Sequence, residues 1–323
     1  MQRRHSIRVV QIGLGPIGQQ MVQELDRRRA IELVASVDID PEMRGRDSGE
    51  VAGLGRSLGV TVVGSLGDVQ TSADVACVTT TSSLRAAART IIACCERGLA
   101  VVSTCEELSY PWQTQPSLAR EIDEAARDAG VAVLGTGVNP GFVMDLLPVV
   151  ATGASSRVDS IRVERYQDAG LRRRPFQLKV GAGLTKEEFD EKARDGSIRH
   201  VGLTESMHMI AHRMGWSIDR TADGVEPVIG TKTVTGVHQV GRAWSGNRVV
   251  IELVFHAEVG LPDPADRIVV SGAPSFEVVV PGGFHGDQAT GAIVANSMPR
   301  VLDAPPGLRT MIDIMPLSWY EEG

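Results

Sequence analysis

The sequence predicts an α/β protein, and three observations lead to this fold class. Within residues 1–142, short apolar stretches rich in β-branched residues alternate with segments of helical periodicity. A glycine-rich turn at residues 13–18 joins the first of these stretches to the first helical segment. Beyond residue 142, apolar and polar residues alternate with a period of two, which is typical of antiparallel strands. We therefore expect a doubly wound parallel sheet, followed by a second α+β domain built on a mostly antiparallel sheet.

The same periodicity gives the order of elements in the first domain, which we place at residues 1–142. Gly98 and Gly130 each follow a helical segment, at the position where glycine commonly ends a helix. We predict strands at Ile7–Ile12, Ile31–Val37, 60–63, 73–79, 99–103 and 131–134, and helices at 17–25, 84–97 and 118–129.

The second domain is predicted at residues 143–287 and is rich in strands. Its strands are expected at 160–166, 231–244, 248–258, 267–271 and 275–280, with helices at 186–195 and 204–214. A last helix is predicted at 288–301, before the pair Pro305-Pro306. We expect residues 288–323 to return to the first domain as a helix and a tail.

Composition restricts the class of protein further. The chain has 323 residues, 42% of them hydrophobic, and a formal net charge of -7. This acidic balance argues against a nucleic acid as the main partner, because such proteins usually carry a basic surface. We see neither a signal peptide nor an apolar stretch that could span a bilayer, so we expect a cytoplasmic protein without a membrane partner. The four cysteines form no CxxC pair, which predicts reduced, buried thiols and no metal site.

The glycine-rich turn has the pattern GxGxxG and lies between a strand and a helix, the context that gives this pattern meaning. Gly13 permits the tight turn, Gly15 lets the backbone approach a phosphate, and Gly18 permits close packing of helix and strand. The helix N-terminus adds a partial positive charge that favours a pyrophosphate. We therefore predict a Rossmann dinucleotide site formed by Gly13, Leu14, Gly15, Pro16, Ile17 and Gly18.

Asp38 ends the second strand, 20 residues after Gly18. A carboxylate there accepts hydrogen bonds from both ribose hydroxyls of NAD and repels the 2′-phosphate of NADP. Arg44 follows closely and would pair with that phosphate if its loop folds inward; otherwise it belongs to a solvated loop. NAD is therefore the expected cofactor, with NADP as the alternative.

Further polar residues follow strands whose ends meet at the ligand-binding edge of a doubly wound sheet. Thr80, Thr81 and Ser82 come after the strand predicted at 73–79, and they are either cofactor ligands or caps of the next helix. Asn139 lies in a glycine-containing loop after the last strand of the domain. Its amide is a candidate ligand of the cofactor or the substrate.

Two consecutive carboxylates, Glu106 and Glu107, follow the strand predicted at 99–103. In amine oxidation, a nearby carboxylate takes a proton from the amine and stabilises the cationic iminium product. Alcohol oxidation is served better by a lysine or histidine, and this segment contains neither. The pair therefore favours chemistry at a C–N bond, with one of the two carboxylates expected to be a solvated loop residue.

Four segments together resemble the family of 2,4-diaminopentanoate dehydrogenases and native amine dehydrogenases, which is related to dihydrodipicolinate reductases. The resemblance covers essentially the whole chain. It implies reversible NAD(P)-dependent oxidative deamination of an amine, or reductive amination of a ketone or aldehyde with ammonia, by a homodimer built through the second domain. The segments are the glycine loop, Ser-Thr-Cys-Glu-Glu-Leu-Ser-Tyr-Pro at 103–111, Gly-Val-Asn-Pro-Gly-Phe at 137–142 and Gly-Leu-Thr-Glu-Ser at 202–206.

The resemblance also implies roles for individual residues. A glutamate after the strand is catalytic in this family, and we prefer Glu107 to Glu106, because related enzymes with a Glu-Lys-Pro motif place their functional lysine second. Arg165 and Gln167 are pocket residues by the same resemblance, or else belong to an exposed strand face. The predicted substrate pocket comprises Asn139, Phe142, Arg165, Gln167 and His200.

Two further hypotheses compete with this function. One is a reductase or dehydrogenase of a diamino acid or cyclic imine, which needs a site for a substrate carboxylate, and Arg165 is the candidate for that site. The other is a sensor that binds NAD(P) without catalysis. A sensor would retain Gly13 and Asp38 but has no need of the glutamates, so it ranks last.

Overall fold

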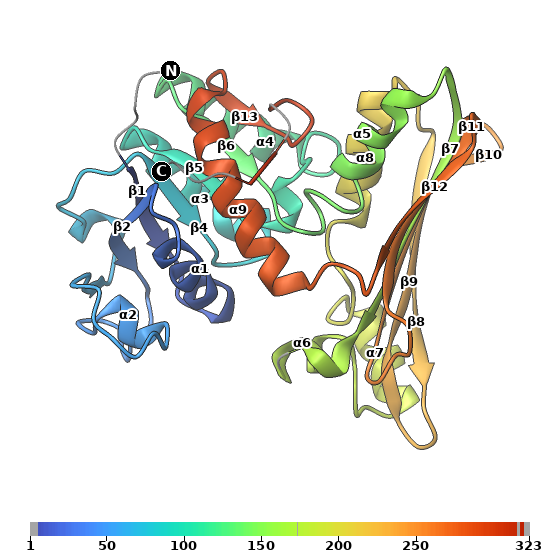
Figure 1. Ribbon diagram of the computed structural model, residues 1–323, viewed down its shortest axis with the longest axis horizontal. Helices are drawn as coiled ribbons and strands as arrows, with labels where there is room; N and C mark the ends of the chain where they lie inside the picture. Colours follow the sequence, from blue (N-terminus) through green and yellow to red (C-terminus); the bar gives the residue numbers. More distant parts are fainter. Residues whose placement is uncertain (1–5, 173, 315–316, 320–323) are drawn as a thin grey trace. The chain divides into compact units, whose positions relative to one another are not determined.

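The computed structural model describes residues 6–172, 174–314 and 317–319, and the chain divides into two compact units (Figure 1). The first unit comprises residues 1–142 and 286–323, and the second comprises residues 143–285. Among the described residues, no helix has the combination of length and apolarity that crossing a membrane requires.

The first unit is built on a seven-stranded sheet in which every pair of neighbouring strands is parallel, as the sequence predicts. The strand order is β13-β6-β5-β4-β1-β2-β3, so the order reverses between β1 and β4, where ligands of such sheets bind. The strands are β1 (Ile7–Ile12), β2 (Ile31–Val37), β3 (Val62–Val63), β4 (Val75–Val78), β5 (Ala100–Ser103), β6 (Ala132–Gly135) and β13 (Gly307–Arg309).

Helices cover this sheet in two adjacent pairs. Helix α1 (Pro16–Asp26) packs beside α9 (Gly286–Asp303), and α3 (Leu84–Glu96) packs beside α4 (Pro116–Asp128). The α3–α4 layer buries Ile91 and Ile122 completely against β1, β4 and β5. Burial of each such side chain contributes about 1.5–3 kcal/mol, which fixes both helices on the sheet. Shorter elements are α2 (Ser48–Val51), η1 (Leu66–Asp68) and η2 (Glu106–Leu108).

The second unit contains a six-stranded sheet in the order β12-β11-β7-β10-β9-β8. Only the β7–β10 pair is parallel among its paired strands, so the sheet is mixed and mostly antiparallel. The strands are β7 (Arg157–Asp168), β8 (Arg220–Ile229), β9 (Val234–Ser245), β10 (Arg248–Glu258), β11 (Ala265–Ala273) and β12 (Phe276–Pro281).

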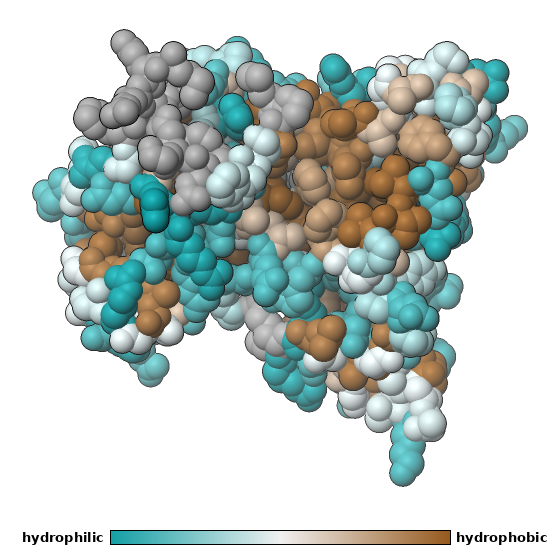
Figure 2. Space-filling model, in the orientation of Figure 1, coloured by the Kyte–Doolittle hydropathy of each residue, from teal (hydrophilic) through white to brown (hydrophobic). Residues whose placement is uncertain are grey.

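The helices of the second unit all lie on one side of its sheet (Figure 1). Apolar side chains of alternate strand positions, such as Ile161, Leu253 and Phe255, are buried on this side. Apolar side chains also gather at the surface over α5 and α8 (Figure 2), where Val150 is 55% exposed. The opposite face of the sheet is rich in charged residues. The helices are α5 (Leu146–Ala151), α6 (Arg174–Lys179), α7 (Lys186–Arg194) and α8 (Leu203–Met214), with short turns η3 (Thr152–Ala154) and η4 (Ala169–Leu171).

Two strands are absent from the sequence prediction. Strand β8 contains Gly224 and Pro227, which weaken a strand signal, but β8 lies at the sheet edge, where a proline is tolerated. Strand β13 has only three residues, so it carries no periodicity to detect. The strand expected at 231–244 begins at Val234, and the helix expected at 288–301 spans Gly286–Asp303.

Candidate active site

The glycine loop makes a close backbone contact at the start of α1. Gly13 has a φ of +90°, which favours glycine. A Cβ atom at Gly18 would lie 1.8 Å from the Gly13 carbonyl oxygen, so no side chain fits there. A Cβ atom at Gly15 would meet nothing within 4 Å, so the space beside this residue is open. The two glycines therefore serve different purposes: Gly18 permits packing, and Gly15 leaves room for a ligand.

Two buried side chains hold this loop in place by hydrogen bonds to its backbone. The Gln11 amide donates hydrogen bonds to the Gly13 carbonyl oxygen at 2.9 Å and to Thr79 Oγ1 at 2.7 Å. Thr79 Oγ1 donates to the same carbonyl at 2.9 Å. Sequence reasoning missed Gln11, although a lone glutamine in an apolar strand directly before the loop was a usable signal.

The N-terminus of α1 fits a dinucleotide pyrophosphate. Gly15 is the N-cap residue, Pro16 begins the helix, and no side chain caps the first-turn amides. These amides and the helix dipole favour an anion at this point. Together with the open space at Gly15, they are consistent with the phosphate cradle that the sequence predicts.

Asp38 contacts the loop from the end of β2. Its Oδ2 atom accepts a hydrogen bond from the Leu14 amide, and its Oδ1 atom accepts one from the Asp40 amide at 2.8 Å. Arg44 Nη2 donates to the Ile39 carbonyl at 2.9 Å, and the guanidinium lies against Gly64, where a Cβ atom would be 3.0 Å from Arg44 Cζ. The Arg44 loop thus folds back toward the end of β2.

The loop after β4 contributes more backbone than hydroxyl contacts. Thr80 is exposed, and its methyl group lies near Gly13. Thr81 Oγ1 accepts a hydrogen bond from the Ser83 amide at 3.2 Å, which is a local turn contact. The Ser82 carbonyl accepts from Cys105 Sγ at 3.2 Å and from the Glu107 amide at 3.4 Å. This loop is therefore joined to the acidic segment after β5.

The two glutamates of η2 have different surroundings, and both are half-buried. Glu107 Oε2 accepts hydrogen bonds from the Leu84 amide at 2.8 Å and from Gln115 Nε2 at 2.6 Å. Among the described residues, no donor contacts the Glu106 carboxylate within hydrogen-bond distance. One carboxylate therefore holds neighbouring segments, and the other is available to a ligand.

Asn139 lies in the loop after β6 and is buried. It is followed by a cis bond to Pro140, and Gly141 has a φ of +124° with Gly137 close by. The Val138 amide donates to Thr290 Oγ1 of α9 at 3.3 Å. The loop is thus fixed by its own turn and by the helix that returns from the second unit. Phe142, the last residue before that unit, is half-buried.

In the second unit, Arg165 and Gln167 of β7 converge on one backbone oxygen. Arg165 Nη2 and Gln167 Nε2 donate to the Phe284 carbonyl at 2.8 and 3.2 Å. The Arg165 side chain is 1% exposed, and its Nε lies 3.8 Å from Asp266 Oδ1. Burial lowers the pKa of Arg165 to about 10, although the negative charge of Asp266 opposes this shift. Arg165 therefore keeps its positive charge at neutral pH.

His200 is stacked on Phe255 with ring centroids 4.4 Å apart. The Gln239 side chain binds the backbone of His200 on both sides, accepting from its amide at 2.6 Å and donating to its carbonyl at 3.0 Å. Burial, reinforced by the positive charges of Lys179 and Arg165, lowers the pKa of His200 to about 3. The ring is therefore neutral at neutral pH.

The structure thus brings the predicted residues together within each unit. The glycine loop, Asp38, the β4 loop and the acidic pair share the edge of the first sheet at the carboxyl ends of its strands. Arg165 and Gln167 share the Phe284 carbonyl, and the positive charge of Arg165 helps to keep the neighbouring His200 ring neutral. Among the described residues, no three metal-ligating side chains gather into a site.

This arrangement defines a class: a dehydrogenase-like α/β protein with a doubly wound sheet, a glycine loop suited to a dinucleotide and two glutamates at the same sheet edge. Comparison with known proteins gives the family. Residues 142–321 match the model of the 2,4-diaminopentanoate dehydrogenase C-terminal domain, and residues 7–109 match that of the dihydrodipicolinate reductase N-terminus. The chain belongs to the 2,4-diaminopentanoate dehydrogenase family, as the sequence resemblance predicts.

Individual relatives agree with this assignment. A 2,4-diaminopentanoate dehydrogenase from Acetoanaerobium sticklandii is 31% identical, over 95% of this chain and 93% of its own. An amine dehydrogenase from Streptomyces virginiae is 24% identical, over 94% of both chains. The solved amine dehydrogenase from Mycobacterium smegmatis shares the fold over 99% of both chains, with a TM-score of 0.87 and 24% identity.

Two glycine substitutions separate folding from cofactor binding. We expect Gly15→Ala to fold like the unchanged protein, because its Cβ atom meets nothing within 4 Å, but to bind NADH at least 10-fold more weakly, because the new methyl group occupies the space for the pyrophosphate. Gly18→Ala places Cβ 1.8 Å from the Gly13 oxygen and should lower the free energy of unfolding by several kcal/mol.

NADH fluorescence titration and urea unfolding measure the two effects. A Gly15→Ala protein that binds NADH normally would show that the phosphates lie elsewhere.

Proposed function

We propose that this protein is an NAD(P)-dependent amine dehydrogenase, which interconverts an amine with a ketone or aldehyde and ammonia. The observation that carries the proposal is the acidic pair in η2, which is tied to the loop after β4 and lies at the same sheet edge as the glycine loop. A carboxylate there suits an amine, because the iminium formed in the reaction is a cation. A dehydrogenase acting on alcohols needs a group that stabilises an alkoxide instead.

One carboxylate of η2 can serve the proton transfers in both directions of this reaction. A carboxylate of η2 takes one proton from the ammonium form of the amine. A nicotinamide cofactor held at the glycine loop would supply the hydride acceptor for the carbon that bears nitrogen. The carboxyl group returns that proton to solvent, so that the carboxylate again carries the charge that stabilises the iminium. Water then adds to the iminium carbon to release ammonia, a proton and the carbonyl compound. In the opposite direction, the same carboxylate takes a proton from ammonium and so generates the ammonia that attacks the carbonyl carbon.

We assign the proton transfer to Glu106 rather than to Glu107, the residue that the sequence resemblance favours. Glu107 Oε2 already accepts two hydrogen bonds from the protein, at 2.8 and 2.6 Å. Glu106 is half-buried, and no donor among the described residues contacts its carboxylate. A carboxylate that exchanges protons with a ligand must be available to it, and Glu106 meets this requirement.

NAD is the proposed cofactor, and NADP is the alternative that Arg44 makes possible. The Asp38 carboxylate faces the glycine loop through the Leu14 amide, where an adenosine ribose lies in doubly wound dehydrogenases. The Arg44 guanidinium lies at the Ile39 carbonyl, one residue further along the chain. Its positive charge offsets part of the repulsion between Asp38 and a 2′-phosphate.

A second candidate is a dehydrogenase specific for amines that carry a carboxylate. Arg165 is buried, charged at neutral pH, and its Nη1 atom has no hydrogen-bond partner among the described residues. Lys179 and Arg172 add positive charge around the neighbouring His200. Buried guanidinium groups are strong carboxylate ligands, because they form two parallel hydrogen bonds. This cluster supports a substrate such as a diamino acid.

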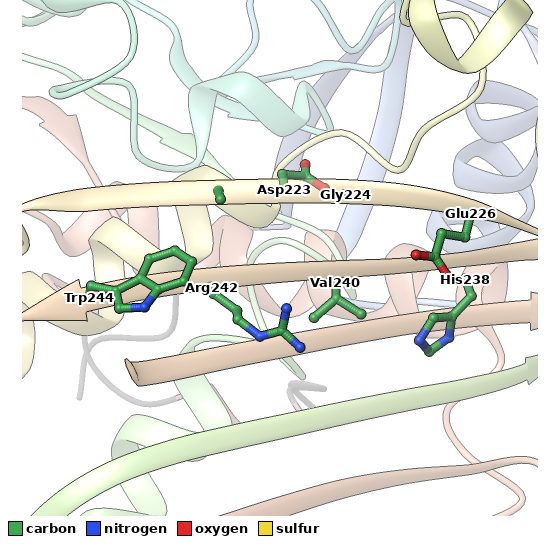
Figure 3. Close-up of a pocket in the computed structure, with 8 residues that line it drawn as sticks. Asp223, Gly224, Glu226, His238, Val240, Arg242 and Trp244 are labelled. Carbon is green, nitrogen blue, oxygen red and sulfur yellow. The ribbon is translucent and has the colours of Figure 1, made fainter. Parts of the chain in front are cut away.

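We further propose that the protein forms a homodimer through the uncovered face of the second sheet. Figure 3 shows Trp244, Arg242, Val240 and His238 in a row along this face of β9. Charges of both signs alternate across it, because Glu252 pairs with both Arg162 and Arg242 on the flanking strands. A face that carries both charges and apolar residues is complementary to a second copy of itself in a two-fold dimer.

The cysteines support a cytoplasmic location. Cys77, Cys94, Cys95 and Cys105 are all buried and unpaired. Burial raises the pKa of Cys77 to about 12, which leaves its thiol protonated and unreactive. Such thiols suit a reducing compartment.

The catalytic assignment predicts a large effect of one substitution. Glu106→Gln removes the proton acceptor while keeping the side-chain volume, so kcat for reductive amination should fall about 10²–10⁴-fold with little change in NADH affinity. The acidic limb of the kcat/KM profile against pH should disappear, and neutral His200 does not replace it. NADH consumption with ammonium and a panel of ketones and aldehydes measures the rate. Glu121→Gln, an exposed substitution on α4, is the control, and an unchanged rate in Glu106→Gln would refute the assignment.

The carboxylate candidate predicts discrimination between two amines that differ in one group. 2,4-Diaminopentanoate should have a kcat/KM at least 100-fold above that of its uncharged amide, because the amide cannot form two charge-assisted hydrogen bonds with the Arg165 guanidinium. Arg165→Met should remove this preference. Arg165→Met alone would leave the Asp266 carboxylate buried without its partner charge. The double variant Arg165→Met with Asp266→Asn removes both charges and tests the same loss of preference. Equal rates with the two amines would refute this candidate.

The dimer proposal predicts a change of mass on one substitution. Val240→Asp puts a charge in the centre of the uncovered face and should convert the dimer to a monomer in sedimentation velocity, without unfolding. Val259→Asp is the matched control, because Val259 is already 40% exposed beyond the end of β10. A dimer of unchanged affinity in Val240→Asp would place the interface elsewhere.

A further inference from the structure

Glu107 joins three segments of the first unit through one carboxylate oxygen. The residue belongs to η2, and Oε2 accepts from the Leu84 amide at the start of α3 and from the side chain of Gln115 directly before α4. These partners are 23 and 8 residues away along the chain. The contact is therefore tertiary, and it relates the acidic turn to both helices that cover this face of the sheet.

Helix α3 depends on this carboxylate for its N-terminal cap. Ser83 is the N-cap residue, but its side chain makes no capping hydrogen bond, and the first turn contains no acidic residue. The partial positive charge of a helix N-terminus is stabilised by a nearby carboxylate, and its first amides need acceptors. Glu107 supplies both from outside the helix.

The backbone of η2 is fixed on two further sides. The Glu107 amide and Cys105 Sγ both donate to the Ser82 carbonyl, at 3.4 and 3.2 Å. Leu108 is completely buried and passes so close to β6 that a Cβ atom at Gly135 would lie 2.6 Å from its carbonyl carbon. These contacts fix the turn relative to the strand ends, and Glu107 adds the side-chain hydrogen bond to the first amide of α3.

We propose that Glu107 is a positioning residue, which holds η2 against α3 and Gln115 so that the neighbouring Glu106 presents its carboxylate to the substrate. This inference rests on the proposed function, because it assigns a purpose to the geometry around the proton acceptor. Movement of Glu107 toward a ligand would leave the Leu84 amide and the Gln115 amide group without their acceptor. The pair thus divides its work between two adjacent residues.

A charge-swap experiment tests the division. Gln115→Glu sets two carboxylates against each other, because position 115 then lacks the donor that binds Glu107 Oε2. Adding Glu107→Gln restores a hydrogen bond between positions 107 and 115 with donor and acceptor exchanged, and the new amide oxygen still accepts from the Leu84 amide. We expect Gln115→Glu to lower kcat about 10–100-fold with the acidic limb of the pH profile retained, and the double variant to recover at least half of the activity.

The opposite pattern would overturn the proposal. If Glu107→Gln removed the acidic limb, lowered kcat at least 1000-fold and gained nothing from Gln115→Glu, Glu107 itself would be the proton acceptor. Glu106→Gln serves as the reference for that pattern.

Amide hydrogen exchange does not depend on turnover. It therefore tests the positioning role of Glu107 separately from the proposed amine dehydrogenase function. Loss of the cap in Glu107→Ala should speed amide exchange in residues 84–87 at least 10-fold, with no change in α4 beyond its first turn. Asp123→Asn is the matched control. The Asp123 carboxylate also accepts a hydrogen bond from a backbone amide, that of Leu308 at 2.8 Å, but Leu308 belongs to β13, the outermost strand beside β6. Unchanged exchange in residues 84–87 would overturn the positioning role even if no amine substrate were found.

Discussion

The active-site edge of the first unit depends on one close contact, the approach of Gly18 to the carbonyl of Gly13. A Cβ atom at position 18 would lie 1.8 Å from that oxygen, so the turn closes only around glycine. Gln11 and Thr79 donate to the same oxygen, which joins the end of β4 to the end of β1. The loop that continues from Thr79 accepts hydrogen bonds from η2 at Ser82. The position of the acidic pair therefore follows from the glycine loop through a continuous series of short-range contacts.

The second unit is organised around buried charge rather than around a backbone turn. Arg165 and Asp266 lie on neighbouring strands, and removing one partner of such a buried pair costs about 3–5 kcal/mol. Both hold Phe284, since Arg165 donates to its carbonyl and Asp266 accepts from its amide. Phe284 lies two residues before α9, where the chain returns to the first unit. The same polar residues thus fix the end of the second unit and provide the positive charge proposed for substrate recognition.

Sequence reasoning succeeded where local pattern and tertiary environment agree. Strand β1 is buried at every position but one and β2 over its last three residues, so both contain the short apolar stretches that predict their bounds. It failed where the environment decides. The edge position that tolerates Pro227 in β8 is visible only in the assembled sheet. The choice between Glu106 and Glu107 stays a prediction, and the sequence alone does not make it. Adjacent residues of a 3₁₀ turn point in different directions, and Leu84 and Gln115, far along the chain, bind one of the two carboxylates.

The division between adjacent carboxylates has a physical reason. A proton acceptor becomes neutral in every catalytic cycle, and a neutral carboxyl group is a weaker acceptor for a helix amide than a carboxylate. Hydrogen bonds to charged groups contribute about 1.5–3 kcal/mol, so a single glutamate with both tasks would weaken the start of α3 each time it took a proton. The movement would spread to the loop after β4, because Ser82 lies between η2 and Leu84. In the proposed division, a fixed charge at Glu107 lets Glu106 gain and lose a proton while the edge of the sheet at the glycine loop stays in place.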